Sequence, residues 1–143
     1  MGIQSDKMEK IMTYKLVNLQ VFGDKDGSLI SLESNKNVPF DIKRVYYIFG
    51  TAQGVRRGKH AHQRLKQLVI CTSGSCKFLL DDGKSKDIVE LSKPNEGLFL
   101  ESLVWREMFD FSPDCVLMVL ASAHYDEEEY IRNYDEFLEK AGK

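Results

Sequence analysis

The chain has 143 residues, of which 43% are hydrophobic and 29% are charged, and its formal net charge at pH 7 is −2. This length and composition are typical of one globular domain with a sizeable core, and the small net charge excludes a general attraction to nucleic acid or to an anionic membrane. An anionic ligand would have to be attracted by local arginine side chains.

The ends of the predicted domain follow from polarity. Residues 1–13 are polar and are expected to form a loose N-terminal segment, which leaves residues 14–143 as a single domain. The first residues contain no apolar run of the signal-peptide kind, and no stretch approaches the ~20 apolar residues of a membrane span. We therefore expect a cytoplasmic protein, in which the three cysteines are reduced, buried thiols.

Most of the chain consists of short apolar or alternating runs separated by turns rich in Gly, Pro, Asn and Asp. Such runs predict strands at residues 14–22, 28–33, 43–49, 68–71, 76–80, 88–91, 98–100, 104–111 and 115–121. In the third of these, Arg44, Tyr46 and Ile48 share one face, because side chains alternate along a strand.

The pattern changes near the C-terminus. Asp126 and Glu129 have the spacing of a capping box, which marks the start of a helix. Helical spacing follows in Tyr130, Ile131, Tyr134, Phe137 and Leu138. Many short strands and one terminal helix predict an all-β fold, which is an antiparallel β-barrel or double-sheet jelly roll with one C-terminal α-helix.

The densest concentration of chemically active side chains lies at His60 and His62, two of the three histidines in the chain. Residues two apart on a strand point to the same side, so both imidazoles would face one pocket. Imidazole serves as an acid, a base or a metal ligand near neutral pH. The spacing alone equally allows an ordinary pair of solvent-facing or hydrogen-bonded histidines.

The surroundings of this pair resemble the first motif of the cupins. Gly54, His60 and His62 stand in register with that motif, and Gly74 stands at its final glycine. Gln67 occupies the place where a metal-binding cupin carries a glutamate. The cupin motif is therefore present here, except that a neutral amide replaces one of the expected metal ligands.

The second cupin motif would add a further histidine, and Arg106 stands in its place. A protonated guanidinium cannot bind a cation, and the remaining His124 lies beyond the last predicted strand. We therefore predict no catalytic metal, and acid/base work by His60 and His62. Arg44 and Arg106 lie on predicted pocket strands, where guanidinium groups suit diphosphates and developing enolates.

Longer segments resemble one family much more closely. Residues 40–48, 57–62, 97–99, 104–108 and 125–135 look like the WxcM-like sugar 3,4-ketoisomerases, and the resemblance covers about residues 17–137. It implies a homodimeric cupin without metal or other cofactor, in which N-terminal strands are exchanged between subunits. It also implies a substrate, dTDP-4-keto-6-deoxyglucose, whose product supplies 3-amino-3,6-dideoxyhexoses for lipopolysaccharide, other surface polysaccharides or antibiotics.

The resemblance implies His60 and His62 as the catalytic pair, with Arg44, Tyr46 and Arg57 in the nucleotide-sugar pocket. Moving the ketone from C4 to C3 needs a proton to leave C3 and another to reach C4 through an enediol, and it needs no redox cofactor. A catalytic arginine and Gln67 are expected to hold the sugar oxygens.

The stereochemistry of the product depends on Arg106. Arginine cannot deliver a proton, so C4 should receive its proton from the histidine pair, on the face that lost one at C3. That outcome predicts the gluco product, dTDP-3-keto-6-deoxyglucose. The alternatives are a galacto product, a sugar-nucleotide 3,5-epimerase, a metal-dependent oxygenase and a sugar-binding cupin without enzymatic activity.

Overall fold

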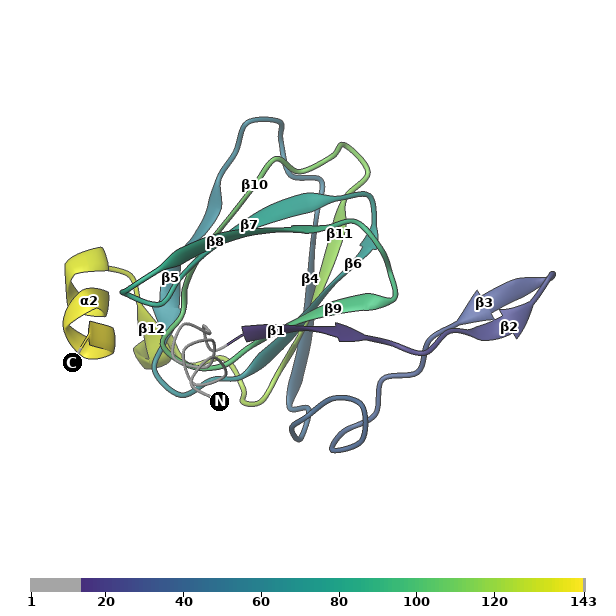
Figure 1. Cartoon of the computed structure of the whole chain (residues 1–143), viewed down its shortest axis with the longest axis horizontal. Helices are drawn as coiled ribbons and strands as arrows, with labels where there is room; N and C mark the ends of the chain where they lie inside the picture. Colours follow the sequence, from purple (N-terminus) through teal and green to yellow (C-terminus); the bar gives the residue numbers. More distant parts are fainter. Residues whose placement is uncertain (1–13, 143) are drawn as a thin grey trace, which may run out of the picture.

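The computed structural model describes residues 14–142, and the segment predicted to be loose, 1–13, lies outside the described residues. Two five-stranded sheets curve around a common interior and form an open roll, with one short α-helix at the C-terminal end (Figure 1). The prediction of an all-β cupin-type fold with one C-terminal α-helix is confirmed. Among the described residues, no helix has both the length and the apolar character that a membrane crossing requires.

Every strand pair within the two sheets is antiparallel. The first sheet has the order β1-β9-β6-β11-β4, formed by Tyr14–Asn18, Glu96–Leu100, Gln67–Ser73, Val116–Ala121 and Arg44–Phe49. The second has the order β12-β5-β10-β7-β8, formed by Tyr130–Ile131, Arg57–His62, Trp105–Phe109, Cys76–Asp81 and Lys86–Leu91. The strands β4 and β5 belong to different sheets and border the side of the roll where the candidate site lies, with β4 at the edge of its sheet and β5 next to the short edge strand β12.

The core fills the space between the two sheets with apolar side chains from both. Phe78 on β7, Leu98 on β9 and Leu117 on β11 are at most 1% exposed and belong to one continuous cluster. The predicted alternation of β4 is confirmed, since Tyr46 and Ile48 pack against this cluster. The opposite face of β4 is exposed, as the alternation requires.

A separate hairpin projects away from the roll as an arm (Figure 1). It is formed by β2 (Phe22–Asp24) and β3 (Gly27–Leu29), and all of its residues are exposed. The sequence predicted longer strands at 14–22 and 28–33. The first is interrupted because Leu19 is buried and its N–H donates to the Asn95 carbonyl at 2.8 Å, which directs the chain away from the sheet.

The predicted helix start at Asp126 is wrong. Asp126 caps only a 3-10 turn, η1 (Glu127–Glu129), by accepting a hydrogen bond from the Glu128 N–H. The Glu129 carboxylate accepts from the backbone N–H groups of Arg64 and Leu65, at 2.9 and 3.1 Å, so it does not complete a capping box. These contacts hold the turn against the loop that follows β5.

After this turn the chain forms β12 and pairs with the edge of β5, with Tyr130 opposite His62 and Ile131 opposite Ala61. Pairing satisfies backbone groups that would otherwise remain open at the sheet edge. The helix α2 (Tyr134–Gly142) begins only afterwards, where the Asn133 side chain accepts a hydrogen bond from the Glu136 N–H. Two residues assigned to the helix by spacing therefore belong to a strand beside the histidines.

Candidate active site

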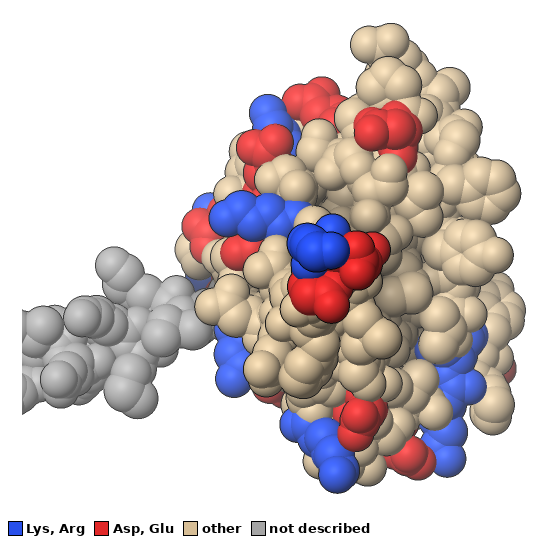
Figure 2. Space-filling view, turned by 90° about the vertical axis from the view of Figure 1, so that its right-hand side faces the viewer, with Lys and Arg blue, Asp and Glu red and all other residues tan. Residues whose placement is uncertain are grey.

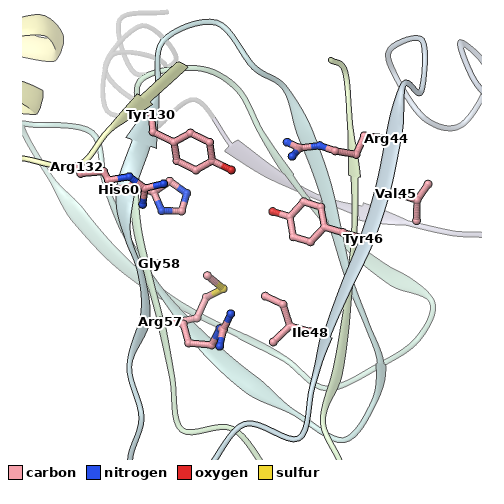
Figure 3. A pocket seen from close by; sticks show the side chains of 10 residues that line it. Arg44, Val45, Tyr46, Ile48, Arg57, Gly58, His60, Tyr130 and Arg132 are labelled. Carbon is pink, nitrogen blue, oxygen red and sulfur yellow. The ribbon is translucent and has the colours of Figure 1, made fainter. Parts of the chain in front are cut away.

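A cavity of about 520 Å³ opens between β4 and β5, within the range of small-molecule sites (Figure 3). Its walls are formed by Arg44, Val45, Tyr46, Ile48, Arg57, Gly58, His60, Met108, Tyr130 and Arg132. Figure 3 shows Tyr46 and Tyr130 on opposite walls with their hydroxyl groups turned toward the space between them. His60 lies beside Tyr130, so the cavity brings an imidazole and two phenols together.

A β-bulge in β5 determines which side chains enter the cavity. Arg106 of β10 pairs with His60, but the next residue, Glu107, pairs with Gly58, so Lys59 is an extra residue in β5. Gly58 and Lys59 adopt positive φ angles of 87° and 61°. Strict alternation would put residues 57 and 60 on opposite faces, and the extra residue lets both line the same cavity.

The two histidines lie on one face, as their spacing predicted, but at different depths. Their ring centroids are 4.9 Å apart and the rings meet edge to face. His60 lines the cavity, whereas His62 is completely buried behind it. The Tyr130 ring contacts both, with centroids 4.9 Å from His60 and 4.5 Å from His62. A ligand in the cavity would therefore meet His60 first.

Several buried nitrogen atoms of this site have no partner. Within the described part of the chain, Nδ1 of His60, both ring nitrogens of His62 and Nε of Arg44 are buried without a hydrogen bond. Buried polar groups in folded proteins are almost always hydrogen-bonded, because an unpaired one costs about 1–3 kcal/mol. Such a concentration of unpaired groups around one cavity is typical of a site that a polar ligand completes.

Both imidazoles are neutral near pH 7. Burial, reinforced by the charge of Arg106, lowers the pKa of His60 to about 3 and that of His62 to about 2. The sequence interpretation assigned acid/base work to both histidines. In this environment each can only accept a proton first, and an acid arises when one of them has done so.

Arg106 is the buried charge behind the histidines. It is 3% exposed, and burial lowers its pKa to about 10, which still leaves it protonated at neutral pH. Its Nη1 donates to the Gln67 Oε1 at 2.6 Å and its Nε donates to the Val104 carbonyl at 3.1 Å. Gln67 Nε2 in turn donates to the Tyr46 hydroxyl at 3.2 Å. The network links β10, β6 and β4 beneath the cavity.

Further arginines surround the cavity itself. The Arg44 guanidinium lies 5.2 Å from the Tyr46 ring and 5.6 Å from the Tyr125 ring. Arg132 lies 4.4 Å from the Tyr130 ring. With Arg57 they line a cavity that is positive on several sides, which compensates for the small negative charge of the whole chain.

The structure divides the predicted site residues into two layers. Arg44, Tyr46, Arg57 and His60 line the cavity. The residues directly behind it are His62, Gln67 and Arg106, all at most 3% exposed. Sequence reasoning missed Tyr130 and Arg132, which line the cavity from the segment that was read as helix. Their place in the family-like segment 125–135 was the signal that could have identified them.

The donor groups here do not fit a cupin-type metal centre. The two imidazoles are accompanied by Gln67 and by Arg106, whose backbone lies opposite His60 in the sheet and whose guanidinium donates to Gln67. A fixed positive charge at this position repels a cation and offers no lone pair. The arrangement instead suits binding of an anionic ligand and proton transfer.

Comparisons with known proteins agree with this geometry. The family model described as FdtA, WxcM-like, C-terminal, matches residues 12–142. A TDP-4-oxo-6-deoxy-alpha-D-glucose-3,4-oxoisomerase from Aneurinibacillus thermoaerophilus is 50% identical over 92% of this chain and 95% of its own length.

Two solved structures are similarly close. The TDP-quinovose 3,4-ketoisomerase WlaRB from Campylobacter jejuni is 52% identical, with a TM-score of 0.87 over 90% of this chain and 99% of that chain. The sugar 3,4-ketoisomerase QdtA from Thermoanaerobacterium thermosaccharolyticum, in complex with TDP, is 46% identical, with a TM-score of 0.89 over 91% of this chain and 95% of that chain.

Proposed function

The chain belongs to the WxcM-like family of sugar 3,4-ketoisomerases, and we propose that its substrate is dTDP-4-keto-6-deoxyglucose. It is an isomerase of dTDP-sugar metabolism that moves a ketone between C4 and C3. The observation that supports this substrate most directly is the cluster of unpaired imidazole nitrogens beside an arginine-lined cavity.

His60 is the proposed base, because it is the histidine that lines the cavity. Neutral at the start, it removes the proton from C3, which the adjacent C4 carbonyl makes acidic. The electron pair of the C–H bond forms the C3–C4 double bond of an enediolate, and the negative charge moves to the oxygen on C4. His60 then gives up its proton, and C4 takes up a proton. At the same time the hydroxyl proton on O3 passes to the oxygen on C4, and the electron pair of that O–H bond forms the C3 carbonyl. The ketone has then moved to C3, and protons and electrons balance over the whole reaction.

The buried residues behind His60 tune these steps. The positive charge of Arg106, opposite His60 in the sheet, stabilises the enediolate. The same charge weakens the proton affinity of His60, so the imidazolium readily gives up the proton that it took from C3. A bound diphosphate and the enediolate both raise the proton affinity of the imidazole, which lets it act as a base only when substrate is present. His62 and Gln67 orient these groups.

The proposed product keeps the gluco configuration. Arg106 retains its proton, so it is not the group that protonates C4. In a gluco sugar the hydrogens on C3 and C4 lie on opposite faces of the ring, so the same-face return of the proton expected from the sequence would give the galacto product. The gluco product requires a proton donor on the face opposite His60, where Figure 3 shows the Tyr46 hydroxyl on the facing wall. The 52% identical relative is a ketoisomerase of TDP-quinovose, and quinovose is 6-deoxyglucose.

The arginines of the cavity wall are proposed to bind the diphosphate of the substrate. Arg44, Arg57 and Arg132 present guanidinium groups, which form paired hydrogen bonds to phosphate oxygens. Tyr46 is assigned to the sugar, because its hydroxyl faces the cavity and is held by Gln67.

Turnover is proposed to need no metal and no other cofactor. The donor set argued above does not fit a cation, and the proposed proton transfer moves no electrons between molecules. Activity should survive exhaustive treatment with EDTA. Loss of turnover that one divalent ion restores would contradict the proposal.

The chain is also proposed to act as a homodimer with exchanged N-terminal strands. The outer face of the edge strand β4 exposes Val45, Tyr47 and Phe49, and the arm exposes Phe22 and Leu29. Figure 2 looks along the arm and shows broad uncharged areas between groups of charged side chains. Exposed apolar surface and an open strand edge are typical of an interface.

Strand exchange would keep the β1–β9 pairing but make it between subunits, whereas this single chain forms it internally. Sedimentation should show a dimer at micromolar concentration. A stable, fully active monomer would contradict this proposal.

Proton NMR of the protein with dTDP-4-keto-6-deoxyglucose tests the function directly. We expect signals of the 3-keto isomer with gluco coupling constants at C4. Galacto couplings would show that the proton returns to the face from which it was removed and would contradict the gluco assignment, and deuterium uptake at C5 would indicate a 3,5-epimerase. Substrate that remains unchanged after long incubation would contradict enzymatic activity on this sugar.

A further inference from the structure

A second cluster of reactive side chains lies inside the roll, apart from the cavity. It contains Cys71 on β6, Cys76 at the start of β7 and Cys115 just before β11, all between 1% and 4% exposed. Cys71 stands four residues along β6 from Gln67, or about 13 Å at the usual rise of a strand. The cluster therefore lies toward the other end of the roll from the catalytic groups.

The three sulfur atoms gather at one point. The Sγ atoms of Cys71 and Cys115 are 3.7 Å apart, and all three Sγ atoms lie within 4.8 Å of one another. A metal ion bound at about 2.3 Å by each of three thiolates needs sulfur atoms about 3.8–4.0 Å apart. Small rotations of the side chains would bring the trio to that spacing without moving a strand.

We propose that Cys71, Cys76 and Cys115 form a binding site for one thiophilic d10 metal ion, of the class that includes Zn(II), Cd(II) and Cu(I). Soft thiolate sulfur selects these ions over Mg(II) or Ca(II). Each sulfur that coordinates releases its proton to solvent, and no electrons are transferred. The described residues offer no fourth His, Cys, Asp or Glu ligand to the group, which favours ions that accept three-fold sulfur coordination.

The surroundings of Cys71 favour loss of its thiol proton. A hydrogen bond with Cys76 is the largest of the influences that lower the pKa of Cys71 to about 7. The Asp114 carboxylate lies near enough to raise the pKa values of both Cys71 and Cys115. The Asp114 carboxylate therefore disfavours a second thiolate beside the first. For the same electrostatic reason it favours a bound cation that replaces the thiol protons.

The site would connect parts of both sheets. Cys71 belongs to the first sheet and Cys76 to the second, and Cys115 ends the turn between β10 and β11. A bound ion would therefore stabilise the folded roll, since ions that bind only the folded state raise its stability. It would leave the proton transfers at His60 unchanged, because none of the three thiols lines the cavity.

The test uses the full chain, reduced and stripped of metal under anaerobic conditions. Cd(II) serves as the probe, because thiolate-to-cadmium charge transfer gives an ultraviolet absorption band. The band should saturate at one ion per chain, and Tm should rise by roughly 5–10 °C when free Cd(II) exceeds its Kd about 100-fold. Competition by Zn(II) and by Cu(I) then shows which ion the site prefers.

Variants separate this site from the histidines. Cys115→Ala should abolish the band and the shift in Tm, and a double variant with His60→Asn and His62→Asn should keep both. If Cys115→Ala does not fold, Cys76→Ala and the rate of alkylation of the unmodified thiols provide the same test. Bound Cd(II) should slow that alkylation at least tenfold.

A band that is absent, that persists in both cysteine variants, or that is lost in the histidine variant would overturn the proposal. The proposal would also be overturned if the reduced protein took up no Cd(II) and two of the thiols formed a disulfide on exposure to air.

Discussion

The two ends of β6 lie in interiors of opposite character. Gln67 at one end is buried and accepts a hydrogen bond from the buried guanidinium of Arg106. At the other end, Cys71 belongs to the large apolar cluster that includes Phe78 and Leu117. A fold that only had to be stable would continue the apolar packing along the whole strand.

This difference shows that the end of β6 with the proposed catalytic groups contributes less to stability than the apolar end. Each fully buried large apolar side chain contributes about 1.5–3 kcal/mol, whereas each unpaired buried polar group costs about 1–3 kcal/mol. The three unpaired imidazole nitrogens lie at the polar end only. Mutations at that end should therefore change activity more than stability, and mutations at the apolar end should do the reverse.

The largest expected effect separates activity from stability at the polar end. His60→Asn removes the proton carrier but keeps a side chain of similar polarity, so kcat should fall about 10²–10⁴-fold while Tm does not fall. His124→Asn is the matched control, because His124 is exposed and outside the cavity. Steady-state turnover and thermal unfolding measure both quantities. Turnover of His60→Asn within tenfold of the unmodified protein would refute the assignment.

The apolar end should show the opposite behaviour. Phe78→Ala removes a ring that is 1% exposed, and the free energy of unfolding should fall by about 3–5 kcal/mol. Ile88→Ala, on the adjacent strand β8 and 64% exposed, should change it by less than about 0.5 kcal/mol. Urea unfolding measures both. Equal effects of the two variants would show that the apolar end is not the source of stability.

Acid should destabilise the protein through the polar end. The folded-state pKa values of His60 and His62, about 3 and about 2, lie below the value of about 6.5 for an unfolded chain. The unfolded state therefore binds more protons in that interval, and stability present above pH 6.5 is lost as the pH falls. At pH 5.5 the loss should be about 1.4 kcal/mol for each histidine.

Urea unfolding between pH 7.5 and pH 5.5 measures this loss. His62→Asn should reduce it by about half, because only one buried imidazole then remains to be protonated. The same pH dependence in His62→Asn and the unmodified protein would show that His62 is not held neutral by the fold.

The sequence predicted those features of the molecule that follow from local periodicity. Alternation along residues 43–49 placed Arg44 and Tyr46 on the inner face, and the spacing of His60 and His62 placed both rings on one side. The replacement of a ligand by Arg106 predicted a guanidinium that faces the pocket, and the structure places Arg106 buried behind the cavity, opposite His60 in the sheet.

Features that depend on strand pairing could not be predicted in this way. The bulge at Lys59 arises from the pairing of β5 with β10, and it brings Arg57 into the cavity. Tyr130 recurs at helical spacing, yet pairing with β5 outweighs that local preference. The neutral state of the histidines depends on burial and on Arg106 from another strand, which periodicity does not reveal.

The smallest expected effect concerns Tyr130, one of the cavity residues that sequence reasoning missed. Its ring packs against both histidines, and its hydroxyl faces the cavity (Figure 3). Tyr130→Phe keeps the ring and removes one hydrogen bond to the sugar. A net hydrogen bond contributes about 0.5–1.5 kcal/mol, so kcat/KM should fall only about 2–12-fold, with Tm little changed.

This variant also tests whether Tyr130 itself carries a proton. If the Tyr130 hydroxyl only positions the sugar, steady-state kinetics should show a modest loss. If the phenol delivered the proton to C4, Tyr130→Phe would lower kcat by about 10²–10⁴-fold, as loss of a general acid does. Tyr130 lies beside His60, so it would protonate C4 from the side of the base, and the gluco assignment would lose its basis. A loss of that size would therefore contradict opposite-face protonation even if His60→Asn were inactive.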